Sequence, residues 1–514
     1  MSAGHEKKVF TLEKLDSIIK EQKLKGKKIV QCHGCFDLIH PGHIRHLASA
    51  KKRGDVLVVT ITSDRHVNKG PGRPIFNEQL RAETLASLAT VDYVAINDAP
   101  NAVGSINIIR PHIYIKGNEF EDGKDLHGGI AAEVRAVAAV GGKAEFTDDI
   151  TFSSTKLINN SDFFAPYPEV AKEFLRKFQK KFNFETIQSY FEKIKDYKVL
   201  VIGEAIIDEY HYVRTMNKSL KDPIITTRYE NEESFAGGVL ACANHVAGYC
   251  KNVDLITCLG KQDAKEEFIK SHLKPNVKTK FVYNPNAPTI VKRRFVDPAF
   301  LTKMFEVYYF DDKPFSSEIE SDLLRYLIKV LPRYDLVIAV DYGHGFLTPA
   351  MRKVISEKSS FLALNTQTNG ANYGFHIVTK YPKADYVSID HLEARLALRK
   401  KDIAPREWSG AIRKIAGHLD AGAVAITLGH EGCLFLRDKE VFRVPVFSTR
   451  VVDRVGAGDA FLAITAPLVK AGLPAEALGF VGNAVGAVAV TIVGNKEAVQ
   501  PSILLKSINT MLTR

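Results

Sequence analysis

Two short stretches of the chain combine residues that suit phosphate chemistry. The first, HGCFDLIHPGHIRHL, places His40 and His43 around Pro41 and Gly42, directly before a helical pattern. Proline suits the first turn of a helix, and the open N–H groups of that turn bind anions. Two histidines three residues apart can donate hydrogen bonds to one anion. This stretch therefore predicts an anion site at a helix start.

The second stretch, DRVGAGD, runs from Asp453 to Asp459 and precedes another apolar helical pattern. Its small residues leave backbone N–H groups open, which can stabilise charge on a phosphoryl group during transfer. Asp459 is placed to take a proton from an attacking hydroxyl. The chain contains no GxxxxGK[ST] sequence, which excludes a P-loop kinase.

The elements that must position these residues follow an α/β pattern. From Lys28 to about Asn160, short β-branched runs alternate with helical patterns, which predicts βαβ units and a parallel sheet. The pattern resumes at Tyr197, with strand-like insertions near 226–232 and 289–309 that predict a small β lid. We therefore expect domains at 1–160 and 197–514, joined by a helical linker at 161–196.

The composition favours small polyanionic ligands over larger partners. The chain has 514 residues, 45% of them hydrophobic, and a formal net charge of +11. The densest basic cluster, Lys172 to Lys181, carries helix-spaced apolar residues and reads as an amphipathic connector, so we expect neither a nucleic-acid partner nor a membrane. Six cysteines and no signal-peptide pattern predict a cytoplasmic protein.

The first stretch, with its GxFD and HxGH elements, resembles the nucleotidyltransferase superfamily of cytidylyltransferases and adenylyltransferases. The resemblance implies a Rossmann-like domain in which His40 and His43 stabilise a nucleoside triphosphate during attack on its α-phosphate. It implies further nucleotide-binding candidates, namely Gly34, Phe36, Asp37, Lys69, Arg81, Lys116, Ser154 and Thr155.

Three other interpretations of this region are weaker. His40, His43 and His46 could bind zinc, but no fourth ligand lies at a fixed spacing nearby. The CxxC spacing of Cys32 and Cys35 could be redox-active, although Cys35 fills a variable position of the motif. The SxxK spelled by residues 153–156 lacks the KTG that accompanies it in β-lactamases.

The second stretch resembles the C-terminal signature of ribokinase-like (PfkB) carbohydrate kinases, from about Lys198 to the end. The resemblance implies a three-layer α/β/α domain with a β lid, with Asp459 as the catalytic base and Mg2+ bridging the phosphates. It assigns nucleotide binding to Thr427, Gly429, Gly432, Gly456, Ala457 and Gly458. It assigns sugar binding to Asp208, Gly237, Gly238 and Asn244, with Glu393 as a possible magnesium residue.

Several positions depart from the kinase pattern. Arg454 stands where threonine is usual, and Ile464 where glycine is common. The expected asparagine falls on Ala241 or Cys242, which leaves Asn244 as a displaced candidate. The segment 390–393 replaces the usual NxxE. These departures are compatible with phosphoryl transfer, but they leave the identity of the sugar undetermined.

Together the two modules resemble bifunctional heptose-phosphate kinase/nucleotidyltransferases of the ADP-heptose synthase type, in reversed order. The resemblance implies phosphorylation of a sugar or sugar phosphate, then coupling of a sugar phosphate to ATP or CTP with release of pyrophosphate, giving a nucleotide-sugar for surface polysaccharide. A homodimer is expected. A CTP-dependent glycerol- or ribitol-phosphate cytidylyltransferase fused to its kinase is the alternative, and a scaffold with degenerate sites is a third.

Overall fold

The computed structural model of the protein describes residues 8–67, 74–117, 129–147, 168–299, 301–311, 313, 315–448 and 451–513. The chain falls into two compact units, residues 1–166 with 509–514 and residues 167–508. The predicted domain limits stay predictions, because the passage between the units at 148–167 lies outside the described residues. Among the helices that are described, none is both long and apolar enough to cross a membrane.

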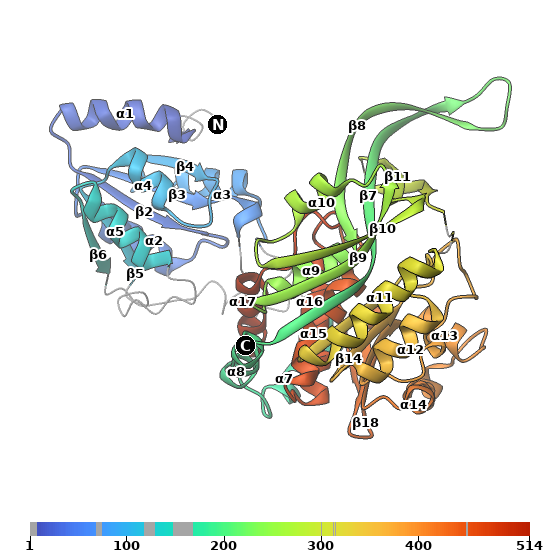
Figure 1. Ribbon diagram of the computed structural model, residues 1–514. Coiled ribbons are helices and arrows are strands. Elements are labelled where there is room, and N and C mark those ends of the chain that lie inside the picture. Colours follow the sequence, from blue (N-terminus) through green and yellow to red (C-terminus); the bar gives the residue numbers. More distant parts are fainter. Residues whose placement is uncertain are drawn as a thin grey trace. The chain divides into compact units, whose positions relative to one another are not determined.

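The first unit contains a six-stranded sheet in which all neighbours are parallel, in the order β1-β4-β3-β2-β5-β6 (Figure 1). The strands are β1 (Val9–Phe10), β2 (Ile29–Gly34), β3 (Val56–Thr62), β4 (Tyr93–Asn97), β5 (Ile113–Gly117) and β6 (Lys143–Thr147). β2 to β6 lie in the stretch from Lys28 to about Asn160 for which the sequence predicts alternating strands and helices. The Rossmann-like parallel sheet predicted for this region is therefore confirmed.

Helices cover both faces of this sheet because its central strands are apolar on both sides. Val30 and Cys32 of β2 face the core beneath α2 (Pro41–Lys51) and α3 (Glu78–Ala86). Ile29 faces the opposite core. That second face is covered by α1 (Leu12–Leu24), α4 (Val103–Ile109) and α5 (Gly129–Ala139).

The second unit contains a large mixed sheet ordered β10-β9-β7-β13-β14-β15-β16-β17-β18. Its strands are β7 (Lys198–Lys218), β9 (Asn252–Gln262), β10 (Val277–Pro288), β13 (Leu336–Asp341), β14 (Leu362–Thr366), β15 (Tyr386–Asp390), β16 (Ala423–Thr427), β17 (Cys433–Arg437) and β18 (Glu440–Val444). Pairing is parallel as far as β16 and antiparallel beyond it.

The two predicted insertions form a lid that grows out of β7. Residues 198–204 of β7 pair with β9 in the main sheet, while residues 205–218 pair with β8 (Ile225–Gly238). β11 (Ile290–Asp297) pairs with the same part of β7, and β12 (Thr302–Tyr309) extends it. One continuous strand therefore carries the chain from the core sheet into the lid.

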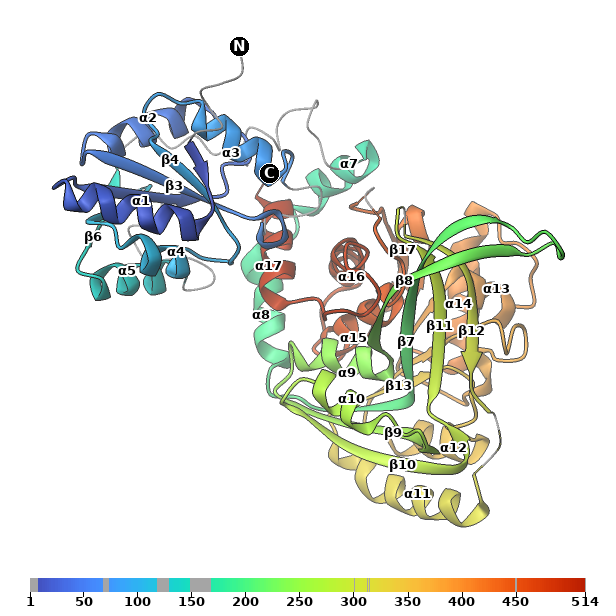
Figure 2. The same ribbon diagram turned by 90° about the horizontal axis from the view of Figure 1, so that it is seen from above.

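Two helical layers enclose the main sheet, as Figure 2 shows from above. One apolar core lies under α11 (Ser317–Val330), α12 (Pro349–Lys358), α13 (His391–Ala397) and α14 (Trp408–Leu419). The opposite layer holds α9 (Val239–Ala247), α15 (Ala457–Lys470) and α16 (Ala475–Ala489). The remaining helices are α7 (Glu169–Phe178), α8 (Phe184–Ile194), α10 (Glu266–His272) and α17 (Pro501–Leu512). The predicted ribokinase-like three-layer fold with a lid is thus confirmed.

Candidate active sites

The first candidate site lies where β2 ends and α2 begins. Gly34 closes β2, and Phe36 adopts a left-handed φ of 47° that turns the chain toward the helix. His40 is the N-cap: its Nδ1 accepts a hydrogen bond from the Gly42 N–H at 3.1 Å, and Pro41 fills the first helical turn. An open helix start of this kind favours a bound anion.

The two motif histidines stand side by side at this helix start. The rings of His40 and His43 stack with centroids 3.9 Å apart, and Phe36 packs its ring against His43 at 5.3 Å. His40 is buried. The fold therefore brings together the residues that the sequence selected for a triphosphate, and their role in binding it stays a prediction.

Other nucleotide candidates of this unit lie at neighbouring strand ends. Asp37 is buried and accepts a hydrogen bond from the Ile75 N–H at 2.6 Å. Lys116, near the end of β5, forms an ion pair of 3.2 Å with the buried carboxylate of Glu133. Three further candidates lie outside the described residues: Lys69, Ser154 and Thr155.

Arg81 of α3 is buried, and its guanidinium is engaged by the protein. It donates to the carbonyl oxygens of Cys35 at 2.5 Å and Thr62 at 2.9 Å, and to the Asp64 carboxylate at 2.6 Å. These bonds tie the loops after β2 and β3 to α3. In this structure Arg81 thus braces the site, and direct phosphate binding by it remains a prediction.

Among the weaker interpretations of this region, the redox and zinc ones gain no support from the described residues, and the SxxK at 153–156 lies outside them. Burial raises the pKa of the Cys32 thiol to about 12, which disfavours the reactive thiolate. The Nδ1 of His46 lies 2.9 Å from the Thr147 hydroxyl of β6. Over the described ranges, no three histidine, cysteine or acidic side chains are grouped to hold a metal ion.

The second candidate site centres on Asp459 in the first turn of α15. Asp459 is buried, and the hydroxyl of Tyr342 donates a hydrogen bond of 2.8 Å to its carboxylate. Burial raises the pKa of Asp459 to about 6; the Tyr342 hydrogen bond and the Lys292 charge oppose this rise, and the Asp208 charge adds to it. A carboxylate with such a pKa is suited to accept a proton near neutral pH.

Asp208 lies on β7 at the root of the lid. Arg294 of β11 donates to one oxygen of its carboxylate at 2.5 Å, and Asn495 donates to the other at 3.1 Å. A side chain at position 237 would not fit, because a Cβ on Gly237 would lie 2.0 Å from the Asp208 carboxylate. Gly238 has a φ of 58°, which favours glycine. Gly237 of the predicted glycine pair therefore makes room for Asp208.

Lid strand β11 supplies a second buried cation. Lys292 is 4% exposed, and its ammonium lies 5.0 Å from the ring centroid of Tyr308 and 5.7 Å from that of Tyr342. Burial lowers the pKa of Lys292, while the charge of Asp208 raises it. Lys292 and Arg294 share one face of the strand, so two positive charges face the acids of the site.

Asp453, at the start of the second motif, joins the lid to the loop that precedes α15. Its carboxylate accepts hydrogen bonds from the Tyr210 hydroxyl of β7 at 2.7 Å and from the Lys303 ammonium of β12. It also accepts from the backbone N–H groups of Val455 at 3.1 Å and Gly494 at 2.9 Å. Burial alone would raise the pKa of Asp453, but these hydrogen bonds hold it below its usual value.

The glycine turn before Asp459 is closely packed. Gly456 is the N-cap of α15 with a φ of 80°, and a Cβ on it would lie 2.1 Å from the Asn495 side-chain oxygen. Ala457 and Gly458 follow as the first helical residues. The open N–H groups of residues 456–458 suit a developing negative charge, and their predicted role as an anion hole remains to be tested.

The nucleotide-side candidates lie at the end of β16, which β17 and β18 separate from the edge of the main sheet. Thr427 is the last residue of β16, and Gly429 and Gly432 follow in a short turn with φ values of 59° and 90°. A Cβ on Gly432 would meet the Val444 carbonyl oxygen at 2.0 Å. These residues shape a tight turn, and their contact with a nucleotide stays a prediction.

Glu393 and Asp390 form a reciprocal cap at the start of α13. One oxygen of Glu393 accepts from the Asp390 N–H at 2.8 Å, and the other accepts from the Thr368 N–H at 3.0 Å. Burial raises the pKa of Glu393 to about 8, and the charges of Asp390 and Asp459 add to the rise. The structure therefore gives Glu393 a capping role that the sequence did not predict.

Sequence reasoning missed most of the basic residues of this site. Lys292, Arg294 and Lys303 come from the predicted insertion, and Asn495 from a loop near the C terminus. The available signal was the KRR run in a β-branched stretch, whose alternation places Lys292 and Arg294 on one face. Asn244, by contrast, donates to the His272 carbonyl oxygen at 2.8 Å, and its sugar-binding role stays a prediction.

Comparison with known proteins supports both resemblances. The model of the family "Cytidylyltransferase-like" matches residues 32–160, and that of the "pfkB family carbohydrate kinase" matches residues 353–501. The chain is therefore similar to the cytidylyltransferase-like family in its first part and to the pfkB carbohydrate kinases in its second, as the two motifs had indicated.

Curated relatives match a part of the chain. A bifunctional protein HldE from Aliarcobacter butzleri is 42% identical over 139 residues, which cover 26% of this chain and 29% of the relative. Another from Methylobacillus flagellatus is 38% identical over 159 residues, 30% of this chain and 31% of the relative. The chain thus spans less than a third of the length of these relatives.

A solved structure supports the fold of the second unit. The crystal structure of a mutant phosphofructokinase-2 from Escherichia coli aligns with a TM-score of 0.50 at 14% identity, covering 62% of this chain and all of the other. At this identity the likeness concerns the fold alone.

Proposed function

We propose that this protein is a bifunctional sugar-activating enzyme. Its kinase would phosphorylate a sugar or sugar phosphate of the heptose-7-phosphate type, and its transferase would couple a sugar phosphate to a nucleoside triphosphate with release of pyrophosphate. The product would be a nucleotide-sugar for surface polysaccharide. The observation that carries this proposal is the buried Asp459, which Tyr342 hydrogen-bonds and which lies in one site with Asp208 and the lid residue Arg294. The same chain also has two stacked histidines at the start of α2.

In the proposed kinase step, Asp459 accepts the proton of a sugar hydroxyl. The hydroxyl oxygen forms a bond to the γ-phosphorus of ATP while the bond to the β–γ bridging oxygen breaks, and ADP leaves. The N–H groups of residues 456–458 would stabilise the transferred phosphoryl group, and Asp208 would hold the sugar. Lys292 and Arg294 would offset the negative charge that gathers there.

In the proposed transferase step, positioning and charge neutralisation suffice, because a sugar phosphate is already an ionised nucleophile. Its oxygen would form a bond to the α-phosphorus of the triphosphate as the bond to pyrophosphate breaks. His40 and His43 would donate hydrogen bonds to the phosphate oxygens at the start of α2.

Magnesium is the metal that we propose for the kinase. Burial raises the pKa of Glu393, the charges of Asp390 and Asp459 add to the rise, and a divalent cation nearby would favour the ionised carboxylate. Magnesium keeps much of its water shell and binds phosphates directly, so a single protein carboxylate fits. Glu393 would hold the hydrated ion, and the ion would neutralise part of the negative charge of the phosphates.

The choice of sugar and nucleotide separates this proposal from a polyol-phosphate cytidylyltransferase. The relatives named HldE support the heptose-phosphate interpretation over the polyol-phosphate alternative. We propose ATP as the phosphoryl donor and ATP or CTP as the transferase substrate, in a cytoplasmic setting where the six free cysteines stay reduced.

We further propose that two copies of the chain pair through their lids. The β7–β8 hairpin, which projects from the second unit in Figure 1, exposes apolar side chains including Met216, Leu220, Ile224 and Ile225. An exposed apolar patch favours association. A dimer mass in light scattering that falls to a monomer mass on Ile224→Glu with Ile225→Glu would support this pairing; an unchanged mass would contradict it.

The experiment that tests the main proposal supplies the protein with ATP or CTP and heptose, polyol or hexose phosphates, and follows ADP and pyrophosphate separately. We expect ADP from the kinase and pyrophosphate from the transferase, with a heptose phosphate as the best substrate. Pyrophosphate from CTP and a polyol phosphate alone would favour the alternative. Neither product with any pair would overturn both activities.

A further inference from the structure

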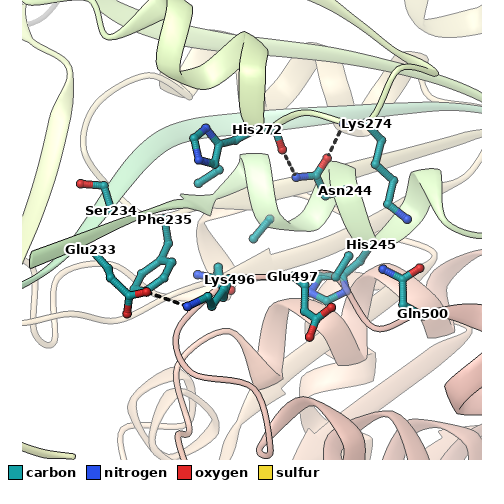
Figure 3. Close-up of a pocket in the computed structure, with 14 residues that line it drawn as sticks. Glu233, Ser234, Phe235, Asn244, His245, His272, Lys274, Lys496, Glu497 and Gln500 are labelled. Atoms are coloured by element: carbon teal, nitrogen blue, oxygen red, sulfur yellow. Dashed lines mark hydrogen bonds and ion pairs between the residues drawn. The ribbon is translucent and has the colours of Figure 1, made fainter. Parts of the chain in front are cut away.

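A cavity of about 430 Å³ lies in the second unit, beside the candidate kinase site. Figure 3 shows its walls, which come from the root of β8, from α9, from the segment after α10 and from the loop that leads into α17. Pockets for small metabolites have this order of volume and a few well-placed polar groups. Asn244, the displaced sugar-binding candidate, lies on one wall, and neither proposed reaction step assigns a role to the cavity.

The walls are held in place by their own hydrogen bonds. Asn244 of α9 donates to the His272 carbonyl oxygen at 2.8 Å and accepts from the Lys274 N–H at 2.9 Å. On the opposite wall, Lys496 forms an ion pair of 2.6 Å with Glu233 of β8. The wall at Asn244 is therefore ordered before any ligand enters, which lowers the entropic cost of binding.

Three polar side chains on the wall remain available for a ligand. Within the described residues, the ammonium of Lys274, the carboxylate of Glu497 and the carboxamide of Gln500 have no hydrogen-bond or ion-pair partner (Figure 3). Burial lowers the pKa of Lys274, so its charge is poorly solvated. An anionic ligand group would pair with Lys274, and hydroxyl groups would donate to Glu497 and bind Gln500.

One loop links this cavity to the candidate catalytic residues. Asn495 lines the cavity, donates to Asp208, and places its side-chain oxygen against Gly456. Its neighbours extend the link, because the Gly494 N–H donates to Asp453 and Lys496 pairs with the lid residue Glu233. A ligand that shifts this loop therefore shifts the sugar-side acid and the glycine turn together.

We propose that this cavity is a second small-molecule site, which takes a phosphorylated sugar or polyol and adjusts the kinase site through Asn495. The phosphate contacts Lys274 and the hydroxyl groups contact Glu497 and Gln500. This proposal has two halves. The binding half, that the cavity binds such a ligand, depends on the cavity alone. The coupling half, that the ligand adjusts the kinase site, rests on the proposed kinase function.

Calorimetry on the full chain tests the binding half, with glucose 6-phosphate, glucose and inorganic phosphate as probes. We expect glucose 6-phosphate to bind more tightly than either of the others. Lys274→Met weakens this binding about tenfold or more, the loss of one charge-assisted hydrogen bond, and Glu497→Gln weakens it less. The matched control Lys353→Met, on the exposed face of α12, leaves the affinity unchanged.

Several results would overturn the binding half. Equal affinity of Lys274→Met and the wild type for glucose 6-phosphate would exclude the cavity, and Glu497→Gln gives the same test should the lysine variant fail to fold. Inorganic phosphate binding as tightly as glucose 6-phosphate would exclude recognition of the sugar hydroxyls. Loss of all binding in Asp208→Asn would assign the ligand to the kinase site instead.

Kinetics test the coupling half separately. With any sugar that the kinase accepts, glucose 6-phosphate should change the sugar KM in the wild type and in Lys353→Met, but not in Lys274→Met. An unchanged sugar KM in the wild type, with the ligand bound by calorimetry, would overturn the coupling and leave the binding site standing. A kinase that is inactive on every sugar would contradict the proposed function. The calorimetric result would still show whether the cavity binds glucose 6-phosphate.

Discussion

The two units build their phosphate sites in opposite ways. In the first unit, the residues around the stacked histidines come from one continuous stretch, from Gly34 to His43. In the second unit, the charged groups around Asp459 come from distant parts of the chain, including β7, β11, β12 and the loop before α17. The centre of the first site is one turn of the chain, which Arg81 of α3 braces, while the second site exists only when the lid has folded against the core.

The difference is also electrostatic. The kinase site collects carboxylates at Asp208, Asp453 and Asp459, and each is matched by a hydrogen-bond donor from another element. Buried charges require such matching, because an unpaired one destabilises the fold strongly. The transferase site relies on imidazoles at a helix start, whose N–H groups already favour an anion. Substitutions should therefore act locally in the first unit and across elements in the second.

The largest expected effect separates the two activities. Asp459→Asn removes the proposed base, so we expect kinase turnover to fall about 10²- to 10⁴-fold while pyrophosphate release from the transferase is unchanged. The measurement is the rate of ADP formation beside the rate of pyrophosphate formation. Asp438→Asn, at an exposed turn, is the matched control and should alter neither rate. Equal loss of both rates would contradict two independent sites.

The reciprocal substitution is His43→Ala. Removal of one imidazole should lower the transferase rate about 10²- to 10³-fold, the effect of losing one donor to a developing charge, and should spare the kinase. His418→Ala, in the last turn of α14, serves as the control. If His43→Ala released pyrophosphate at the wild-type rate, the stacked pair would not be part of the transferase site.

The same contrast explains what the sequence could and could not predict. Most of the central strands, a minority of the helices and both motifs follow from local periodicity and spacing, and the glycine pair at 237–238 was found by its motif. Lys292 and Arg294 were missed as site residues because their role depends on β11 pairing with a strand some 80 residues earlier, in the register Lys292 to Asp208. Local patterns identify such a strand, but the acid it will face is set by tertiary structure.

Lys303 offers a test of the lid connection. Lys303→Met removes the ammonium that bonds Asp453 and leaves a partly uncompensated buried carboxylate near the glycine turn. We expect kcat/KM for the sugar to fall about tenfold, with a smaller change in the KM for ATP, because the lid holds the sugar side. Lys329→Met on the exposed face of α11 is the control. A fall in kcat alone would place the effect in the glycine turn and not in the lid.

The smallest and most specific effect concerns pH. The pKa of Asp459 is about 6, so kinase activity that needs its ionised form should decline below about pH 6. The Tyr342 hydroxyl stabilises that ionised form and holds the pKa down. Tyr342→Phe should therefore raise the pKa and move the acid limb of the kinase profile upward by roughly one pH unit, the equivalent of one hydrogen bond to a charge.

The transferase profile of the same variant should not move, because no described contact of Tyr342 lies in the first unit. Tyr334→Phe, whose hydroxyl bonds Asp254 away from Asp459, is the matched control and should leave both profiles in place. An acid limb that stays fixed in Tyr342→Phe would mean that Asp459 is not the titrating base. A limb that moves downward would mean that the tyrosine stabilises the protonated acid, and the proton would then have to be accepted by another group.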